Sequence, residues 1–437
     1  MASSRKSKSS LKAALPAAKR IGLALSGGLD SVVLLDTVCK ALKANSNDPT
    51  ELWVFHIHHG LQKPADQWLE FCERLAKKYQ VHFDFRLLHF ADLSQGNIEA
   101  RARAERYDAL TDLCIEHGIE DLLLAHHQND QAETVLLQLL RGSGVAGLSG
   151  MPLHRANVNQ GDSITLWRPL LNQCRAELEV YAKEYKLKWV EDPSNQNTRY
   201  RRNAIRKEII PRLEKIQPGA IGNLARSATL LAQSQVLLDR LAKLDGKDLF
   251  KGSKLKLAPL LALAKTDQAA ANNVLRYWLK LNNLAMPSQE RLESWWKDLK
   301  AVKPDSSLEW QHDEVSIYLW RNVLQIAHCM TGQWVFQNVP LRSKSLGLPA
   351  DWVNTAKEQG LIEERLRQGA EKIQIKPNTP RKTLKNLFQE SDTPPWERQA
   401  PLLYIKDQLV AVAGVGASYP HLVSIGRRVL PVWLEKP

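Results

Sequence analysis

Short apolar runs alternate with amphipathic segments between residue 21 and about residue 190. Runs of strand length, rich in apolar residues, stand at 21–25, 52–56, 81–87 and 122–125. Apolar residues recur at helical spacing over 31–44, 65–79, 97–117 and 129–141. Such alternation is typical of βαβ units, which place a parallel sheet between two layers of helices. We therefore expect an α/β fold with a parallel sheet for this part of the chain.

The pattern changes after about residue 215. Residues 216–300 keep a helical spacing, as in NLARSATLLAQSQVLLDRLAKL, and short strand-like runs appear from about residue 310. A chain of 437 residues is also too long for one ordinary core. We expect a disordered basic tail over 1–20, a catalytic α/β domain over 21–215, a mainly helical middle domain over 216–355 and a small mixed α+β domain over 356–437.

The first apolar run ends at a small polar loop, in the sequence IGLALSGGLDSVVLLDTV. Gly27 and Gly28 permit a close approach of a ligand to the backbone, and the free N–H groups of the helix that follows attract anions. The loop lacks the lysine of the GxxxxGK[ST] phosphate loop and carries Asp30 instead. A carboxylate meets phosphates through Mg²⁺, so Asp30 is a candidate magnesium ligand. An ordinary glycine-rich turn is the alternative interpretation.

A second polar segment, AHHQNDQAETVLLQLLRGSG, follows the run at 122–125. Asp130 and Glu133 are three residues apart in the first turn of an expected helix, so both project from one side. The alternative is capping, with Asn129 or Asp130 as the cap and Glu133 as the capping-box partner. His126 stands at the strand end, where it could contact a phosphate, although an ordinary hydrogen-bonded histidine is the commoner case.

The net charge of +13 suits a polyanionic partner. Basic residues gather around Tyr200 at 199–212, and a solvated helix face is the alternative to phosphate binding there. Five scattered cysteines without a CxxC pair favour a reducing compartment and exclude a zinc ribbon. The basic, serine-rich start of the chain has a composition that also suits a transit peptide, but we expect a tail. We expect the tryptophans, including Trp295, Trp296 and Trp396, to pack in cores.

The loop SGGLDS resembles the SGGxDS signature of the PP-loop, or N-type, ATP pyrophosphatases. Members of this superfamily adenylate a carbonyl-type oxygen and release pyrophosphate. The resemblance implies that ATP is a substrate and Mg²⁺ a cofactor, with Asp30 as the metal ligand. The residues that it assigns to ATP binding are Ser26, Gly27, Gly28, Leu29, Asp30, Ser31 and His126.

The segment HHQNDQAETVLLQLLRGSGVAGL resembles the HHxxDQxET…LxRGSGxxGL signature of the tRNA(Ile)-lysidine synthetases. Supporting matches are HIHHGLQ, NIEARARAERY, WRPLL and EDPSNQNTRYRRNAIR, together with residues 381–418 near the end. The resemblance implies a ligase that adenylates O2 of the wobble cytidine in the CAU anticodon of an isoleucine tRNA. Free L-lysine then attacks C2 and releases AMP, and decoding changes from AUG to AUA.

The resemblance also implies roles for particular residues. The catalytic group would be Asp30, Asp130, Glu133 and Arg206, and the lysine-binding group Asp130, Glu133, Arg103 and Arg106. The tRNA-binding group would be Arg141, Arg199, Arg201, Arg202 and Lys207, with further tRNA contacts from the middle and C-terminal domains. Either Arg202 or Arg206 is expected to enter the cleft. A cytoplasmic enzyme without a membrane segment is expected, and a homodimer is left open.

Three other functions are alternatives to lysidine formation. A PP-loop tRNA thiolase would need a sulfur-carrying cysteine or a cluster-binding CxxC, whereas Cys114 and Cys174 are isolated. A glutamine amidotransferase would need an N-terminal cysteine, and the chain starts Met1-Ala2-Ser3. A tRNA-binding relative without activity would have no need of Ser26, Asp30, Asp130 and Glu133. These residues therefore favour an enzyme.

Overall fold

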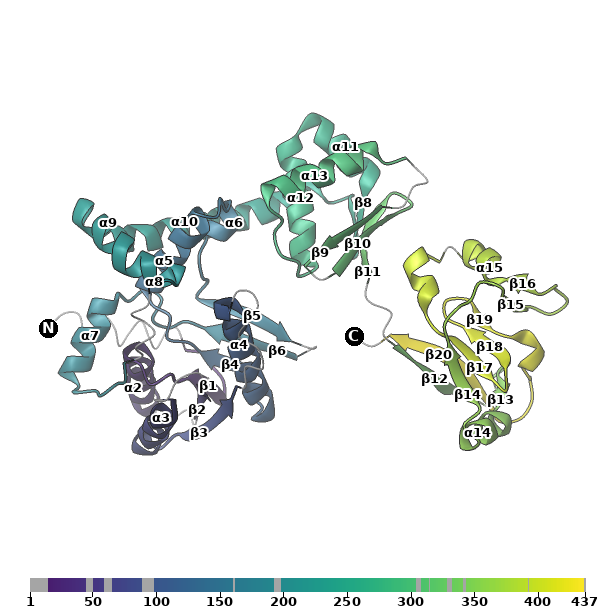
Figure 1. Cartoon of the computed structure of the whole chain (residues 1–437), viewed down its shortest axis with the longest axis horizontal. Helices are drawn as coiled ribbons and strands as arrows, with labels where there is room; N and C mark the ends of the chain where they lie inside the picture. The colour runs from purple at the N-terminus through teal and green to yellow at the C-terminus, as the bar shows by residue number, and fades with distance from the viewer. Residues whose placement is uncertain are drawn as a thin grey trace. The chain divides into compact units, whose positions relative to one another are not determined.

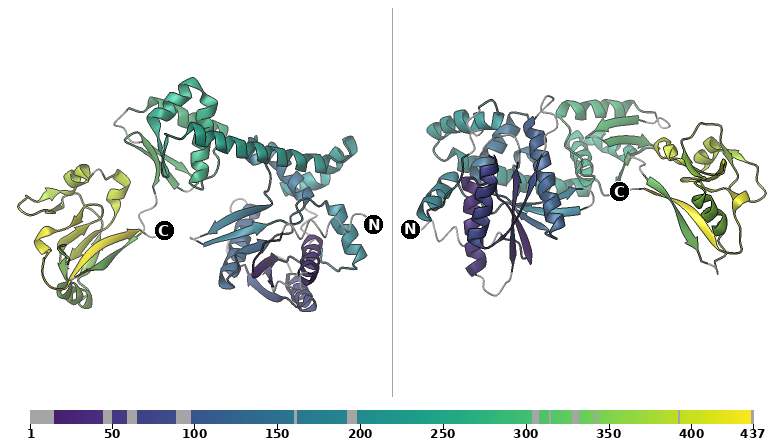
Figure 2. Two further views of the ribbon diagram at one scale, coloured as in Figure 1. Left: turned by 180° about the vertical axis from the view of Figure 1, so that it is seen from behind. Right: turned by 60° about the horizontal axis from the view of Figure 1, so that its bottom comes forward.

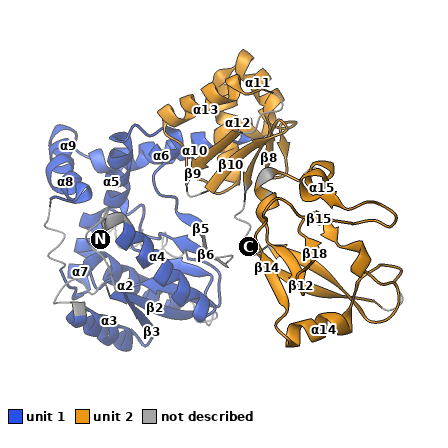
Figure 3. Ribbon diagram, turned by 45° about the vertical axis from the view of Figure 1, so that its right-hand side comes forward, with its two compact units in different colours: residues 1–240 blue, residues 241–437 orange. Residues whose placement is uncertain are grey.

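The structure, a computed structural model, describes residues 15–44, 50–58, 65–88, 98–159, 162–191, 198–303, 308–313, 315–327, 332–340, 343–391 and 393–435. The chain forms two compact units, Met1–Arg240 and Leu241–Pro437 (Figure 3). Most of the expected tail over 1–20 lies outside the described residues, and so does Asn97. Among the helices that the structure describes, none is long and apolar enough to cross a membrane.

A six-stranded sheet forms the centre of the first unit, in the order β3-β2-β1-β4-β6-β5 (Figure 1). Its strands are β1 (Arg20–Ala24), β2 (Glu51–His58), β3 (His82–Leu87), β4 (Asp121–Leu123), β5 (His154–Asn159) and β6 (Asp162–Trp167). Every neighbouring pair is parallel except β5 and β6, which are antiparallel. The expected α/β fold with a parallel sheet is confirmed.

Helices cover both faces of the sheet (Figure 2), and the strand residues divide between two hydrophobic clusters. Leu23 and Leu123 pack with α2 (Leu29–Ala44), α3 (Ala65–Tyr79) and α7 (Arg175–Glu184). Phe55 and Leu122 pack with α4 (Ile98–Glu116) on the other face. Both faces are therefore covered, as the apolar strands of a parallel sheet require.

β1 lies between β2 and β4, so the crossovers that leave it and return to it run in opposite directions along the sheet. A crevice opens beyond the carboxyl ends of the strands at such a switch point. The SGGLDS loop follows β1, and α5 (Gln128–Leu139) follows β4. The topology thus brings the two polar segments together.

The first unit ends in a run of helices that carries the basic segment. These are α8 (Arg201–Ala204), the π-helical turn η2 (Ile205–Ile209), α9 (Ile210–Ile216) and α10 (Ala220–Asp245), and the last of them continues into the second unit. The short α6 (Val145–Leu148) follows α5.

The second unit begins with helices packed on an antiparallel sheet. The helices are α11 (Leu257–Thr266), α12 (Gln268–Leu281) and α13 (Gln289–Ala301). The sheet has the order β7 (Phe250–Lys251), β8 (Lys254–Lys256), β11 (Val323–Ala327), β10 (Val315–Trp320) and β9 (Leu308–His312). Trp295 and Trp296 are buried in this core, and Trp396 is buried further along the chain, as expected.

The rest of the second unit is mixed α+β. β12 (Gly332–Val339) pairs along its length with β20 (Arg428–Glu435), which also pairs with β13 (Leu348–Pro349). A second sheet contains β14 (Ile362–Arg365), β17 (Leu402–Ile405), β18 (Gln408–Val412) and β19 (Gly416–Ala417). A ribbon of β15 (Lys372–Ile373) and β16 (Lys382–Thr383) and the helices α14 (Ala350–Glu358) and α15 (Leu384–Glu390) complete it. β12 and β13, inside the range expected for the middle domain, therefore belong to the sheet that closes the chain.

Candidate active site

Hydrogen bonds of its own hydroxyl groups fix the conformation of the SGGLDS loop. Ser31 Oγ donates to the carbonyl oxygen of Gly28 at 3.0 Å and lies 3.2 Å from Ser26 Oγ. Gly27 has a φ of +83°, and a Cβ there would lie 2.9 Å from Val190 Cγ2. A side chain is excluded at Gly27 by both backbone conformation and space, so this glycine is required by the turn. The buried Leu29 then anchors the start of α2 in the core.

The start of α5 is capped by His127. His127 Nδ1 accepts from the Asp130 backbone N–H at 3.4 Å, and Asp130 Oδ2 accepts from the His127 N–H at 3.0 Å. Asp130 is thus the capping-box partner. Asn129 Oδ1 instead accepts from the backbone N–H of Arg175 at 3.0 Å. The capping interpretation holds in part for Asp130 and leaves Glu133 without a capping role.

His127 also joins the two polar segments. Its Nε2 lies 3.5 Å from Oδ2 of Asp30 and 3.5 Å from Oδ2 of Asp130. Burial by itself lowers the pKa of His127, but the contact with Asp30 and the charges of both carboxylates outweigh it, so the pKa lies above its usual value. The Asp30 and Asp130 carboxylates therefore meet around one imidazole, as the convergence of the two loops predicted.

Glu133 is completely buried and forms a four-membered ion cluster with Asp130 and two arginines. Arg206 binds it through both oxygens, with Nε–Oε1 at 2.6 Å and Nη2–Oε2 at 3.0 Å. Arg202 Nε donates to Glu133 Oε2 at 2.7 Å, and its Nη2 donates to Asp130 Oδ1 at 3.1 Å. Burial raises the pKa of Asp130, but His127 and Arg202 reverse this and hold it below its usual value. Both arginines, rather than one of them, therefore contact the Asp130 and Glu133 pair.

Further arginines lie around His126. Arg103 Nη2 donates to the Tyr107 hydroxyl at 3.3 Å, and burial together with the Arg103 charge lowers the pKa of Arg106. Arg168 is only 5% exposed and donates to the carbonyl oxygen of Pro152 at 2.8 Å. Burial lowers the pKa of His126 to about 3, so this imidazole is neutral at pH 7. The charges of Arg168, Arg103 and Arg202 lower the pKa of His126 as well. This concentration of positive charge suits an anionic group of a ligand.

Arg168 was not singled out from the sequence. An arginine after a strand is usually a surface residue, so Arg168 did not stand out. Its place in the WRPLL match was the signal that could have identified it. Of the expected tRNA-binding residues, Arg202 lies in the ion cluster. Arg141, Arg199 and Arg201 are exposed instead, and Lys207 is half-buried. The basic segment is therefore divided between the ion cluster and the surface.

The residues around Asp30 fit a magnesium ion that is held mainly by its substrate. Asp30 Oδ1 is buried without a hydrogen-bond partner, and Asp130 is its neighbour across His127. Among the residues that the structure describes, no group of three or more acidic, histidine or cysteine side chains could hold a metal by itself. Proteins usually bind Mg²⁺ through one or two carboxylates together with substrate phosphates, and Asp30 and Asp130 are carboxylates of this kind.

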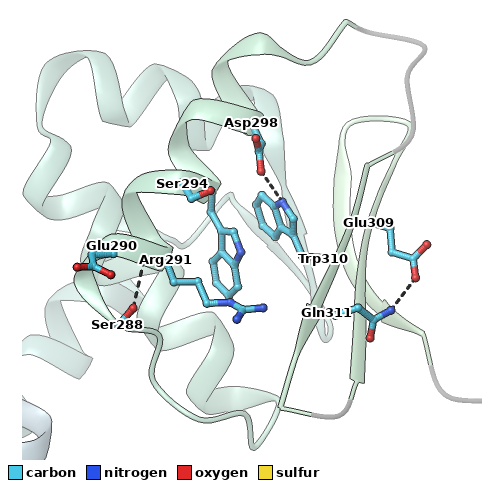
Figure 4. Close-up of a pocket in the computed structure, with 9 residues that line it drawn as sticks. Ser288, Glu290, Arg291, Ser294, Asp298, Glu309, Trp310 and Gln311 are labelled. Carbon is cyan, nitrogen blue, oxygen red and sulfur yellow. Dashed lines mark hydrogen bonds between the residues drawn. The ribbon is translucent and has the colours of Figure 1, made fainter.

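A shallow pocket in the second unit, between α13 and β9, has a different character (Figure 4). Trp295 and Trp310 stack at 4.6 Å with 9° between their planes, and both are almost fully buried. The lining includes three acids, Glu290, Asp298 and Glu309, and one arginine, Arg291. Buried rings and an acidic lining do not suit stacking on nucleic-acid bases or binding of phosphates.

Comparisons with known proteins match three successive segments of the chain to families. Residues 2–213 match the profile of a family described as a PP-loop domain. Residues 255–325 match the "TilS substrate binding domain", and residues 362–426 match the "TilS substrate C-terminal domain". A U34-tRNA thiolase of known structure from Methanococcus maripaludis is similar at 18% identity with a TM-score of 0.45, over 52% of this chain and 78% of that one.

Curated relatives match over nearly the whole chain. The tRNA(Ile)-lysidine synthase of Burkholderia pseudomallei (strain K96243) is 34% identical over 93% of this chain and 90% of the relative. The enzyme of the same name from Salmonella typhimurium (strain LT2) is 35% identical over 93% of this chain and 94% of the relative. With an ATP-binding PP-loop domain, both companion domains and this level of identity, the chain is an enzyme that belongs to the tRNA(Ile)-lysidine synthase family.

Proposed function

We propose that the protein ligates free L-lysine to C2 of the wobble cytidine in a CAU-anticodon isoleucine tRNA, through an adenylated intermediate. The observation that carries this proposal is the buried pair of Asp130 and Glu133 directly beside the ATP loop. An adenylating loop alone would serve many acceptors. Two carboxylates next to it select a cationic nucleophile, and lysine brings an ammonium group.

In the first step, O2 of the cytidine forms a bond to the α-phosphorus of ATP while the bond from that phosphorus to the pyrophosphate oxygen breaks. The backbone N–H groups at the start of α2 and the hydroxyls of Ser26 and Ser31 face the phosphates. Asp30, with Asp130 near it, would hold Mg²⁺. Bound there, the ion would supply positive charge against the phosphate oxygens.

In the second step, the lysine ammonium enters the acidic pair and loses a proton to a carboxylate before its nitrogen attacks C2. Glu133 and Asp130 are already paired with Arg202 and Arg206, so the ammonium must replace a guanidinium. The lysine carboxylate is assigned to Arg103 and Arg106. When the C2–N bond is complete, the C2–O bond breaks and AMP leaves with the oxygen.

The tRNA is assigned to exposed basic residues and to the second unit. Arg141, Arg199 and Arg201 are exposed and carry no role in the ion cluster. Lys207 is half-buried on the same segment as Arg201. Arginine and lysine in this setting bind phosphates and release counterions. The change from AUG to AUA decoding follows from the lysine-modified cytidine. None of these contacts requires a homodimer.

The buried thiols argue against the thiolase alternative. Burial raises the pKa of Cys39, Cys72 and Cys114 to about 12, so these thiols do not ionise at neutral pH. A persulfide carrier needs a reactive, accessible thiolate. The cysteines of the α/β core are therefore packing residues.

The test is to incubate the purified protein with ATP, Mg²⁺, labelled lysine and a CAU-anticodon isoleucine transcript, then to analyse the nucleosides by mass spectrometry. The expected result is a lysine-modified cytidine at the wobble position. A methionine tRNA with the same CAU anticodon is the matched control, and it should remain unmodified. Sulfur incorporation, or modification without lysine, would contradict the proposal.

A further inference from the structure

Arg175 is the first residue of α7, and it lies beside the SGGLDS loop although neither motif contains it. Its Nη1 is 3.9 Å from Oδ2 of Asp30. We propose that Arg175 is a further catalytic residue, which binds the β- and γ-phosphates of ATP and stabilises the departing pyrophosphate. This inference rests on the proposed adenylation step and names a residue for it.

The backbone of Arg175 is fixed from the α5 side. Its N–H donates to Asn129 Oδ1 at 3.0 Å, and the Gln128 N–H donates to the carbonyl oxygen of Gln173 at 2.9 Å. These two bonds tie the start of α7 to the start of α5. The backbone that carries the guanidinium is therefore held next to the start of α5, which carries Asp130 and Glu133.

α7 is also fixed to α2, the helix that carries Asp30. The Tyr181 hydroxyl donates to Asp36 Oδ2 at 2.6 Å, and Lys40 Nζ lies 2.7 Å from the same oxygen. Asp30 and Asp36 belong to one helix, and Arg175 and Tyr181 belong to another. The distance between Arg175 and Asp30 is thus set by helix packing, which is the kind of preorganisation that electrostatic catalysis needs.

The side chain is oriented but remains accessible to a ligand. Arg175 Nε donates to Glu179 Oε1 at 3.3 Å, one helical turn away, and the side chain is 40% exposed. The 3.9 Å between Nη1 and Asp30 is too long for a direct hydrogen bond. The N–H groups of Nη1 can therefore donate to a phosphate oxygen of the ligand. The positive end of the α7 dipole adds to the charge at this point.

The charge balance of the reaction calls for such a group. When the bond between the α-phosphorus and the pyrophosphate oxygen breaks, its electron pair leaves with the pyrophosphate. Arg202 and Arg206 are both paired with Glu133 and Asp130. The guanidinium of Arg175 faces Asp30, where the phosphate tail would meet the metal ligand. A guanidinium can donate two hydrogen bonds to phosphate oxygens there.

The test compares ATP with AMP, because only ATP carries the leaving group. For Arg175→Ala we expect ATP to bind about tenfold more weakly and pyrophosphate release to slow by about 10²-fold, the size seen when other electrostatic stabilisers are removed. AMP binding should be unchanged. Arg175→Lys keeps the charge and should recover part of the ATP affinity.

Arg74→Ala is the matched control, because Arg74 is an exposed arginine on α3 with the same i,i+4 pairing, to Glu70 at 3.4 Å. It should bind both nucleotides like the unaltered protein. Equal weakening of ATP and AMP by Arg175→Ala, or no weakening of either, would overturn the inference. Nucleotide binding needs no tRNA, so an unaltered protein that binds ATP but forms no lysidine would count against the proposed function alone.

Discussion

At the scale of single residues, the ion cluster around Glu133 decides how lysine can bind. Two carboxylates, Asp130 and Glu133, face two guanidiniums, Arg202 and Arg206, so the buried charges balance. An unpaired charge in this place would carry a large desolvation cost. An incoming ammonium that displaces one guanidinium keeps the balance. The site is therefore built for the exchange of one cation for another.

Replacing Glu133 with glutamine tests this exchange. Glu133→Gln keeps the size of the side chain but leaves two guanidiniums facing one carboxylate, so the site loses its preference for an additional cation. We expect the KM for lysine to rise or the kcat of lysine transfer to fall by about tenfold or more. Pyrophosphate release should stay closer to that of the unaltered protein. Both steps can be followed separately with labelled ATP and labelled lysine.

Glu70→Gln is the matched control, because Glu70 is an exposed glutamate in α3 that pairs with the exposed Arg74 across one turn. It removes the same charge without touching the buried cluster, and it should leave the lysine KM unchanged. A lower melting temperature for Glu133→Gln with both steps intact would show that the cluster is structural. The lysine site would then lie elsewhere.

Sequence spacing predicted this cluster only in part. Asp130 and Glu133 follow from their place at the start of a helix, and Arg202 and Arg206 from the density of basic residues. Arg202 and Arg206 are four residues apart, so helical spacing alone would place both on one face of the segment. That this face turns toward Glu133 of α5 is a tertiary contact, which composition and periodicity do not reveal.

At the scale of helices and strands, a buried carboxylate joins three helices behind the site. Asp36 in α2 accepts from the Tyr79 hydroxyl of α3 at 2.7 Å and from the Tyr181 hydroxyl of α7 at 2.6 Å, and Lys40 lies 2.7 Å away. Burial raises the pKa of Asp36, but the Lys40, Tyr181 and Tyr79 contacts outweigh it and hold the pKa below 3.8. The contacts therefore stabilise the charged form in the folded state.

Asp36→Asn should lower the free energy of unfolding by about 2 kcal/mol at pH 7, because hydrogen bonds to a charged group are lost. The sign with pH follows from the lowered pKa. The stabilisation is complete above the ordinary carboxyl pKa of 3.8 and is lost as the pH falls through the lower folded value. The difference between the two proteins should therefore shrink in acid. Urea unfolding of the first unit, followed across this range, measures it.

Asp112→Asn, in an exposed position of α4, is the control and should change stability little at any pH. A constant difference between Asp36→Asn and the unaltered protein down to low pH would mean that shape, rather than charge, holds the three helices together.

Most of the helices and parallel strands could be predicted because each has a clear period. α3 begins and ends at the residues expected, α2 begins two residues early and ends where expected, and α4 and α5 differ by one or two residues at each end. The antiparallel pair β5 and β6 was missed, although HRANVN and DSITLW alternate polar and apolar residues, because each run is short and HRANVN is mostly polar.

At the scale of the whole molecule, the end of the chain returns to an earlier segment. β12 and β20 are paired over their full lengths although about ninety residues separate them along the chain. Composition carries no signal for a contact at such a separation, so the expected start of the last domain at 356 fell after β12 and β13. The sequence nevertheless indicated a mixed α+β region there.

This pairing predicts how the chain can be shortened. A chain that ends at 355 keeps β12 but loses β20, and an unpaired edge strand promotes aggregation. A chain that ends at 327 loses both strands and should remain monodisperse in light scattering. It should bind ATP like the full chain and bind tRNA far more weakly. Equal behaviour of the two shortened chains, or equal loss of ATP and tRNA binding in the shorter one, would contradict this division.

The central claim is that one site activates the cytidine and then delivers lysine to it. The most direct measurement is a reaction with ATP, Mg²⁺ and the CAU-anticodon isoleucine tRNA in which lysine is first withheld and then added. Without lysine, we predict pyrophosphate release and a tRNA that carries AMP, up to one per active site. On addition of lysine, AMP should be released in step with lysine incorporation. Pyrophosphate that appears only after lysine is added, or AMP bound to lysine rather than to tRNA, would contradict the account.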